Sequence, residues 1–177
     1  MKTKIDLLES SRLLLEPRKE LHAIELYDSF CEKDLYRFMK RDVPPSKEWL
    51  AGGFKELERL TSPDGKEIRL GWIGREKKSL KPVGIFEITL LEGEAFVAYT
   101  VFKDFLGHGF AVEASQALID YISSLYKVKR FIIEMDTRNY ASMKVAEKLG
   151  FKFVKYTNNV TFLKNFVSHE FQFEKLI

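Results

Sequence analysis

Apolar residues recur along the chain at two spacings, which predict a mixture of strands and helices. Dense apolar runs predict strands at 12–17, 68–75, 82–91, 94–102, 129–136, 151–157 and 169–176. Apolar positions three or four residues apart predict helices at 47–60, 108–126 and 139–149, with one bent helix or two short ones over 18–40. This order predicts a mixed α/β fold over residues 1–177, with a single domain and a central sheet of about seven strands flanked by helices.

Local residues mark the ends of several of these elements. Ser46 is the expected N-cap of the second helical region, and Gly150 is expected to end the last helix. Glu92 and Gly93 form the expected hairpin turn between two strands. One helix should bury a stripe of residues at helical spacing, namely Ala111, Ser115, Leu118, Ile122 and Leu125.

Composition and charge narrow the class of protein. The 177 residues are 45% hydrophobic and 31% charged, which is typical of a globular domain, and a net charge of +3 gives no reason to expect a nucleic-acid partner. Cys31 is the only cysteine and the three histidines are far apart, so neither a disulfide nor a metal site is expected. The chain has no apolar signal segment or membrane span, which predicts a cytoplasmic protein. The sequence leaves open whether the protein is a monomer or a homodimer.

Two glycines surround a histidine in "FLGHGFAVEA" (105–114), where a strand region gives way to a helix. A glycine turn at a helix start exposes backbone N–H groups to an anion, so Gly107 and Gly109 are expected to let a diphosphate approach. Val112 replaces the third glycine of a dinucleotide fingerprint, and the lysine and hydroxyl pair of a P-loop is absent. A purely structural turn remains the alternative.

A second stretch, "TRNYASMKVAEKLGFKFV" (137–154), places Asn139 and Ser142 at the start of the last helix. Together with "LGHGFAVEA" it resembles the acetyl-coenzyme A signature of the GNAT N-acetyltransferases. "SRLLLEP" near the start resembles the opening strand of their Rim-type branch, whose members acetylate the N-termini of ribosomal proteins. The resemblance implies a GNAT fold that binds acetyl-CoA as cosubstrate through Tyr99, Thr100, Val101, Leu106, Gly107, His108, Gly109, Phe110, Ala111, Asn139 and Ser142.

The sequence departs from the family pattern at three places. Asp104 stands where the superfamily often has glutamine or arginine, and Ala146 where many members have a tyrosine that protonates the leaving thiolate. In the Rim-type branch a serine is assigned that role, and it matches Ser142. The branch's glutamate base falls near Thr161, but residues 157–168 contain no carboxylate.

Acetyl transfer to a primary amine requires a group that takes the amine's proton. Glu87 is the candidate base, acting through water, and the alternative is a carboxylate at a strand edge with no catalytic role. The aromatic residues Trp49, Tyr36 and Phe38 lie where GNAT proteins build the acceptor pocket, and core packing explains them as well. The expected function is therefore direct acetyl transfer to an α-amine or a small-molecule amine. The alternative is a non-catalytic acyl-CoA-binding or sensing domain.

Overall fold

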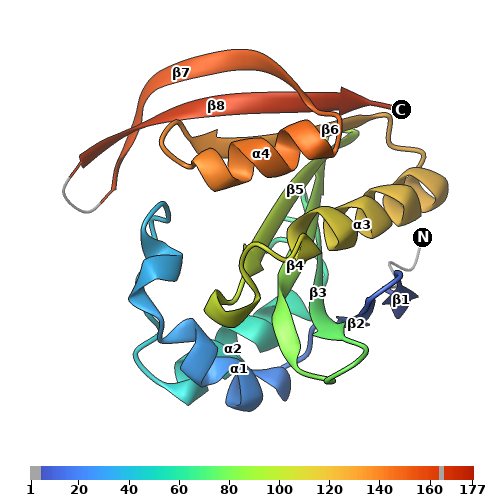
Figure 1. Ribbon diagram of the computed structural model, residues 1–177, viewed down its shortest axis with the longest axis vertical. Helices are drawn as coiled ribbons and strands as arrows, with labels where there is room; N and C mark the ends of the chain where they lie inside the picture. Colours follow the sequence, from blue (N-terminus) through green and yellow to red (C-terminus); the bar gives the residue numbers. More distant parts are fainter. Residues whose placement is uncertain (1–4, 164–165) are drawn as a thin grey trace.

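The computed structural model describes residues 5–163 and 166–177 and contains one mixed sheet (Figure 1). In the described residues the sheet has eight strands in the order β1-β2-β3-β4-β5-β6-β8-β7. The strands are β1 (Leu8–Glu9), β2 (Leu13–Pro17), β3 (Ile68–Glu76), β4 (Pro82–Leu91), β5 (Glu94–Val101), β6 (Arg130–Asp136), β7 (Lys152–Leu163) and β8 (Phe166–Leu176). The sheet has one strand more than predicted, because the two residues of β1 are too few to show a periodic pattern.

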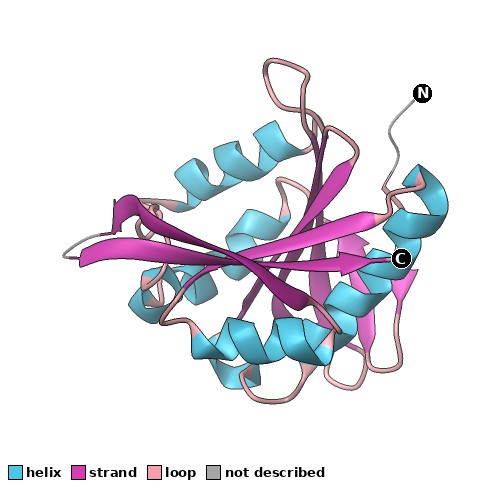
Figure 2. Ribbon diagram, turned by 90° about the horizontal axis from the view of Figure 1, so that it is seen from above, coloured by secondary structure: helices cyan, strands magenta, loops and turns pink. Residues whose placement is uncertain are grey.

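Helices cover both faces of the sheet (Figure 2). They are α1 (His22–Phe30), α2 (Lys47–Leu57), α3 (Phe110–Tyr126) and α4 (Tyr140–Lys148), with short 3₁₀ helices η1 (Lys33–Tyr36) and η2 (Lys103–Phe105). The larger core cluster, which includes Trp72 and Phe131, packs against α3 and α4. The smaller cluster, which includes Phe30 and Ile85, packs against α1 and α2. The sheet therefore presents a different set of residues to each pair of helices.

Several predicted boundaries need correction. The region 18–40 forms two short helical segments, α1 and η1, which is one of the two predicted alternatives. Helix α3 begins at Phe110 rather than at residue 108, because Gly109 has a φ of +82° and cannot continue a right-handed helix. The predicted core stripe is wrong at its end, where Leu125 is 45% exposed. The Ser46 cap is confirmed, since its side chain accepts a hydrogen bond from the Trp49 N–H.

Strands β5 and β6 separate part of the way along their length, and this opening creates the site. Their parallel pairing joins Glu94–Phe96 to Arg130–Ile132 and goes no further among the described residues. The Phe102 N–H donates to the Val83 carbonyl on the β4 side. Because N–H directions alternate along a strand, the N–H groups of Tyr99 and Val101 point away from β4 and into the opening.

No helix among the described residues is both long enough and apolar enough to cross a membrane.

Candidate active site

A cavity of about 430 Å³ opens beside the separated end of β5. Its walls come from β5, the turn before α3 and the first turn of α3, one face of α4, and η1 with the segment that follows it. Every residue expected to bind acetyl-CoA lines this cavity except His108. Two stretches more than thirty residues apart in sequence, around Gly107 and Asn139, therefore meet in one place.

The turn before α3 is shaped to receive an anion. Gly107 and Gly109 both have left-handed backbone conformations, with φ values of +79° and +82°. A Cβ atom added to Gly107 would meet nothing within 4 Å, and one added to Gly109 would meet only the Arg12 guanidinium at 3.6 Å. Gly109 supplies no side-chain cap, so the first N–H groups of α3 are left for a ligand. The glycines provide both the backbone conformation and open space in front of the turn.

Arg12 braces this turn from the side of β2, and no pattern in the sequence indicated it. Its Nε lies 2.7 Å from Glu113 Oε2, and its Nη1 donates to the His108 carbonyl at 3.1 Å. The Arg12 backbone N–H also donates to Glu113, and the guanidinium lies 4.5 Å from the centre of the Phe110 ring. These contacts fix the position of the turn relative to the sheet before any ligand binds.

Helix α4 adds positive charge to the same cavity. Lys144 and Lys148 lie one helical turn apart and both line it. Arg37 lines it from the residue after η1, and the single acidic wall residue, Asp34, lies three residues earlier on the same segment. Phosphate groups carry negative charge, so this wall suits the phosphates of a coenzyme. These basic residues were missed because charge at helical spacing is also typical of a solvated helix face.

Asn139 and Ser142 have separate roles at the start of α4. The Asn139 side chain caps the helix, since its Oδ1 accepts a hydrogen bond from the Ser142 backbone N–H at 3.2 Å. The Asn139 N–H in turn donates to the Asp136 carbonyl. The Ser142 hydroxyl is therefore not needed for the cap and remains in the cavity wall. Its neighbour there is the Tyr99 hydroxyl, and burial raises the pKa of Tyr99 to about 12.

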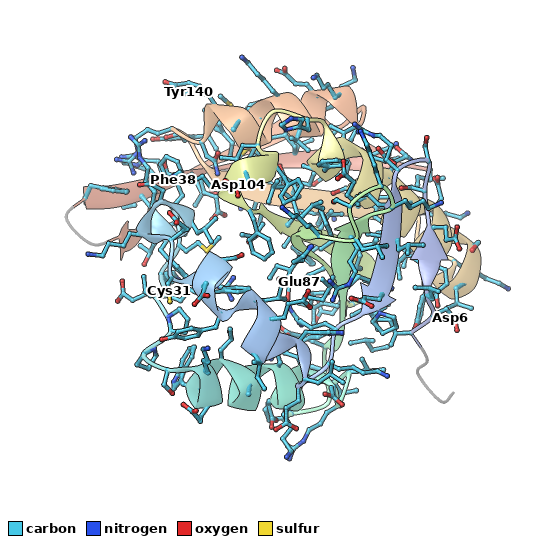
Figure 3. All side chains as sticks on the ribbon, turned by 60° about the horizontal axis from the view of Figure 1, so that its bottom comes forward. Asp6, Cys31, Phe38, Glu87, Asp104 and Tyr140 are labelled. Atoms are coloured by element: carbon cyan, nitrogen blue, oxygen red, sulfur yellow. The ribbon has the colours of Figure 1, made fainter. Side chains whose placement is uncertain are left out.

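A second cavity of about 400 Å³ lies on the opposite face of β5. It is lined by Met39, Lys40, Arg41, Glu87, Ala98, Tyr99 and Thr100. Glu87 and Ala98 are register partners on β4 and β5, so their side chains leave the sheet on the same face. Figure 3 shows Glu87 near the middle of the molecule, between α1 and the strands, whereas Tyr140 lies on the outside of α4.

Glu87 is held by a buried partner. Its Oε1 lies 2.6 Å from Nη1 of Arg18, whose side chain is only 5% exposed whereas that of Glu87 is 27% exposed. Gly71 makes room for this arginine, because a Cβ there would lie 2.7 Å from Arg18 Nη2. The Glu87 carboxylate therefore lies at the edge of the second cavity, whose wall also contains Lys40 and Arg41.

Two carboxylates that the sequence did not single out lie on the same face of the sheet. Glu134 lies two residues beyond Ile132 on β6, and Ala98 two residues beyond its partner Phe96 on β5, so both are on the same sheet face. Glu170 on β8 pairs with Asp136. Glu134 is exposed and Glu170 half-buried, yet the partial loss of water around them raises the pKa of each carboxyl above its usual value. Lys40 and Lys155 oppose this effect at Glu170. Nothing in the sequence shows that β6 and β8 bring these side chains together.

Other predicted residues have mainly local contacts. His108 is exposed, its Nδ1 lies 2.9 Å from the Leu106 carbonyl and its ring stacks on Phe110. Tyr36 is buried and its hydroxyl donates to the Phe30 carbonyl, as expected from core packing. Phe38 lines the larger cavity, whereas Trp49 lines a small pocket of about 100 Å³ beside Arg18.

The profile of the Acetyltransferase (GNAT) domain matches residues 12–152. The chain belongs to the GNAT acetyltransferase family. This confirms the family predicted from the two motifs, and with it acetyl-CoA as the cosubstrate of an N-acetyltransferase. The larger cavity fits that cosubstrate, because N–H groups and lysines line one part of it and the free N–H of Val101 lies in another.

Solved structures share the whole architecture at low sequence identity. One is "RimL- Ribosomal L7/L12 alpha-N-protein acetyltransferase" in complex with coenzyme A, at 18% identity and a TM-score of 0.85, covering 97% of this chain and 98% of the other. A ribosomal-protein-S5-alanine acetyltransferase from Vibrio fischeri has 17% identity and a TM-score of 0.83, covering 97% of each chain. A GNAT acetyltransferase from Bacillus anthracis has 17% identity and a TM-score of 0.81, covering 97% and 98%. No curated protein matches the sequence.

Proposed function

We propose that this GNAT acetyltransferase transfers the acetyl group directly from acetyl-CoA to the α-amine of a peptide, or to a small molecule with such an amine. The observation that carries the proposal is that Tyr99 and Thr100 line both cavities. An acetyl thioester in the larger cavity and an amine in the smaller one would meet across this short stretch of β5. That arrangement supports direct attack within a complex of both substrates.

The groups around this meeting point match the demands of the reaction. The Val101 N–H points into the opening and can donate to the thioester carbonyl oxygen, where negative charge develops. The Ser142 hydroxyl, in the wall of the coenzyme cavity, can donate to the sulfur as the carbon–sulfur bond breaks. Glu87 lines the acceptor cavity and takes the amine's proton through water.

An α-amine suits this site better than a lysine side chain. The α-amine has a pKa of about 8 and the lysine amine about 10.4, so at pH 7.5 the α-amine supplies roughly two hundred times more free base. The RimL structure described above is named as an α-N-protein acetyltransferase, which agrees with this choice. A peptide or protein N-terminus is therefore the acceptor we propose.

Thiol release tests the proposal against the non-catalytic alternative. The protein is incubated with acetyl-CoA and a panel of peptides, polyamines and amino acids, and free thiol is followed over time. We expect release that depends on the amine, at a rate lowered roughly ten- to a thousandfold in Ser142→Ala. Ser124→Ala, a serine on the exposed side of α3, is the matched control and should keep the wild-type rate. Tight acetyl-CoA binding with no amine-dependent release would support the sensing domain instead.

A further inference from the structure

The Tyr99 hydroxyl is buried, and among the described residues it has no hydrogen-bond partner. Leaving a buried hydroxyl unpaired costs about 1 to 3 kcal/mol, so such a group calls for an explanation. Phenylalanine would fill the same space without that cost. The hydroxyl must therefore serve something other than packing.

The position of Tyr99 indicates what the hydroxyl serves. Tyr99 pairs with Phe86 across β4 and β5, and its ring packs on the core that faces α3 and α4. It lines the coenzyme cavity together with Ser142, and Ser142 is the side chain that opposes the effect of burial on the Tyr99 pKa. The two hydroxyls are thus neighbours, without a hydrogen bond of standard geometry between them.

Either hydroxyl can donate to the other, and only donation from Tyr99 leaves the Ser142 hydrogen free for the coenzyme. With a pKa of about 12, the Tyr99 phenol keeps its proton at every pH at which an amine is acetylated, so it is always available as a donor. A serine hydroxyl can accept one hydrogen bond and donate another at the same time. If Ser142 accepts from Tyr99, its own hydrogen must point elsewhere, and the open side of this contact is the cavity.

We propose that Tyr99 is a positioning residue, whose hydroxyl donates to Ser142 Oγ and directs the Ser142 hydrogen to the coenzyme sulfur. This inference rests on the proposed function and deepens it. As the amine nitrogen bonds to the acetyl carbon, the carbon–sulfur bond breaks and its electron pair stays on sulfur. The amine's proton leaves by way of Glu87 and water, and the sulfur departs as a thiolate. Ser142 stabilises that thiolate by a hydrogen bond and keeps its own proton, because serine is a much weaker acid than a thiol of pKa about 8.5.

Kinetics of Tyr99→Phe test this role. We expect kcat to fall about tenfold, while KM for the amine and Kd for acetyl-CoA stay within twofold of wild type. In a Ser142→Ala background the same change should cause no further loss of kcat, because Tyr99 acts through Ser142. Tyr121→Phe is the matched control, since Tyr121 is also a partly buried tyrosine but its hydroxyl donates to Asp6 away from the cavity. A wild-type kcat in Tyr99→Phe, or losses that multiply in the double variant, would overturn the inference.

A binding measurement separates this inference from the proposed function. Isothermal titration at pH 9, where the thiol is largely ionised, gives the Kd values of coenzyme A and of desulfo-coenzyme A. Wild type should bind coenzyme A at least fivefold more tightly, and Tyr99→Phe should lose most of that preference. An equal preference in both proteins would overturn the role of Tyr99, whether or not the enzyme turns over. If the wild-type protein shows no acetyl transfer but Tyr99→Phe still loses the preference for coenzyme A, the result contradicts only the proposed function.

Discussion

Arg18 Nη1 lies 2.6 Å from Glu87 Oε1, and this ion pair joins the buried core below β4 to the edge of the acceptor cavity. The guanidinium also lies over the Phe54 ring, 5.1 Å from its centre. Because Arg18 is buried, Glu87 has a structural role in addition to any role in acetyl transfer. The two roles can be measured separately.

The first prediction concerns stability. Glu87→Gln should lower the free energy of unfolding by about 2 kcal/mol, because it leaves the Arg18 charge buried without a countercharge. The matched control is Glu56→Gln, which breaks an exposed pair with Arg59 and should cost about 0.5 kcal/mol or less. Urea unfolding at pH 7 measures the free energy of unfolding of both variants and of wild type. Equal losses in the two variants would show that the Arg18 pair contributes no more than a surface ion pair.

The second prediction concerns the pH dependence of acetyl transfer. If Glu87 helps to deprotonate the amine, Glu87→Gln should lower kcat/KM most at low pH, with the deficit narrowing as pH rises above the α-amine pKa of about 8. The comparison variants are Glu134→Gln and Glu170→Gln, which remove two other carboxylates of this sheet face. If the pH profile of kcat/KM for Glu87→Gln is parallel to that of wild type and the pH-dependent loss occurs in Glu170→Gln, then Glu170 on β8 is the base.

The third prediction concerns the glycine turn. Acetyl-CoA at a hundred times its Kd should add about 2.7 kcal/mol to the free energy of unfolding. Gly109→Val should abolish that gain by placing a side chain in the space before the turn. Gly65→Val is the matched control, because Gly65 also has a positive φ (+71°) and open space but lies in a turn away from the cavity. Thermal unfolding of each protein with and without acetyl-CoA measures the gain. Without the ligand, both variants should be less stable than wild type. If acetyl-CoA stabilises Gly109→Val as much as wild type, the turn does not bind the diphosphate.

The fold was largely predictable from the sequence because most strands and helices carry strong periodic patterns. The glycine turn and Asn139 were also predictable, since backbone conformation and helix capping are local properties. The brace by Arg12 was not, because it depends on contact between β2 and α3, about a hundred residues apart in sequence. The same holds for Glu134 and Glu170, which share a sheet face only because β8 inserts between β6 and β7.

The fourth prediction concerns Asp136, which ends β6 just before the Asn139 cap. Hydrogen bonds from Arg138 and Ser168 lower the pKa of the Asp136 carboxyl to about 2 from its usual 3.8. A lowered folded-state pKa stabilises the fold above pH 3.8, and that stability is lost as pH falls toward about 2. Asp136→Asn should therefore cost about 2 kcal/mol at pH 7, and progressively less below pH 3.8.

Urea unfolding of wild type and Asp136→Asn between pH 3 and 7 measures this difference. Asp120→Asn, an exposed aspartate on α3, is the control and should cost little at any pH. A loss in Asp136→Asn that stays constant from pH 7 to pH 3 would mean that the carboxylate charge is not what stabilises the end of β6.

The acceptor is tested most directly by one peptide that carries both kinds of amine, a free N-terminal α-amine and a single lysine. The protein is incubated with this peptide and acetyl-CoA at pH 7.5, and tandem mass spectrometry locates the acetyl group on the singly modified product. The structure and the free-base populations of the two amines predict that the acetyl group is on the α-amine in at least nine-tenths of that product. Acetylation mainly on the lysine would contradict the proposed acceptor, and unmodified peptide beside bound acetyl-CoA would contradict acetyl transfer to a peptide amine.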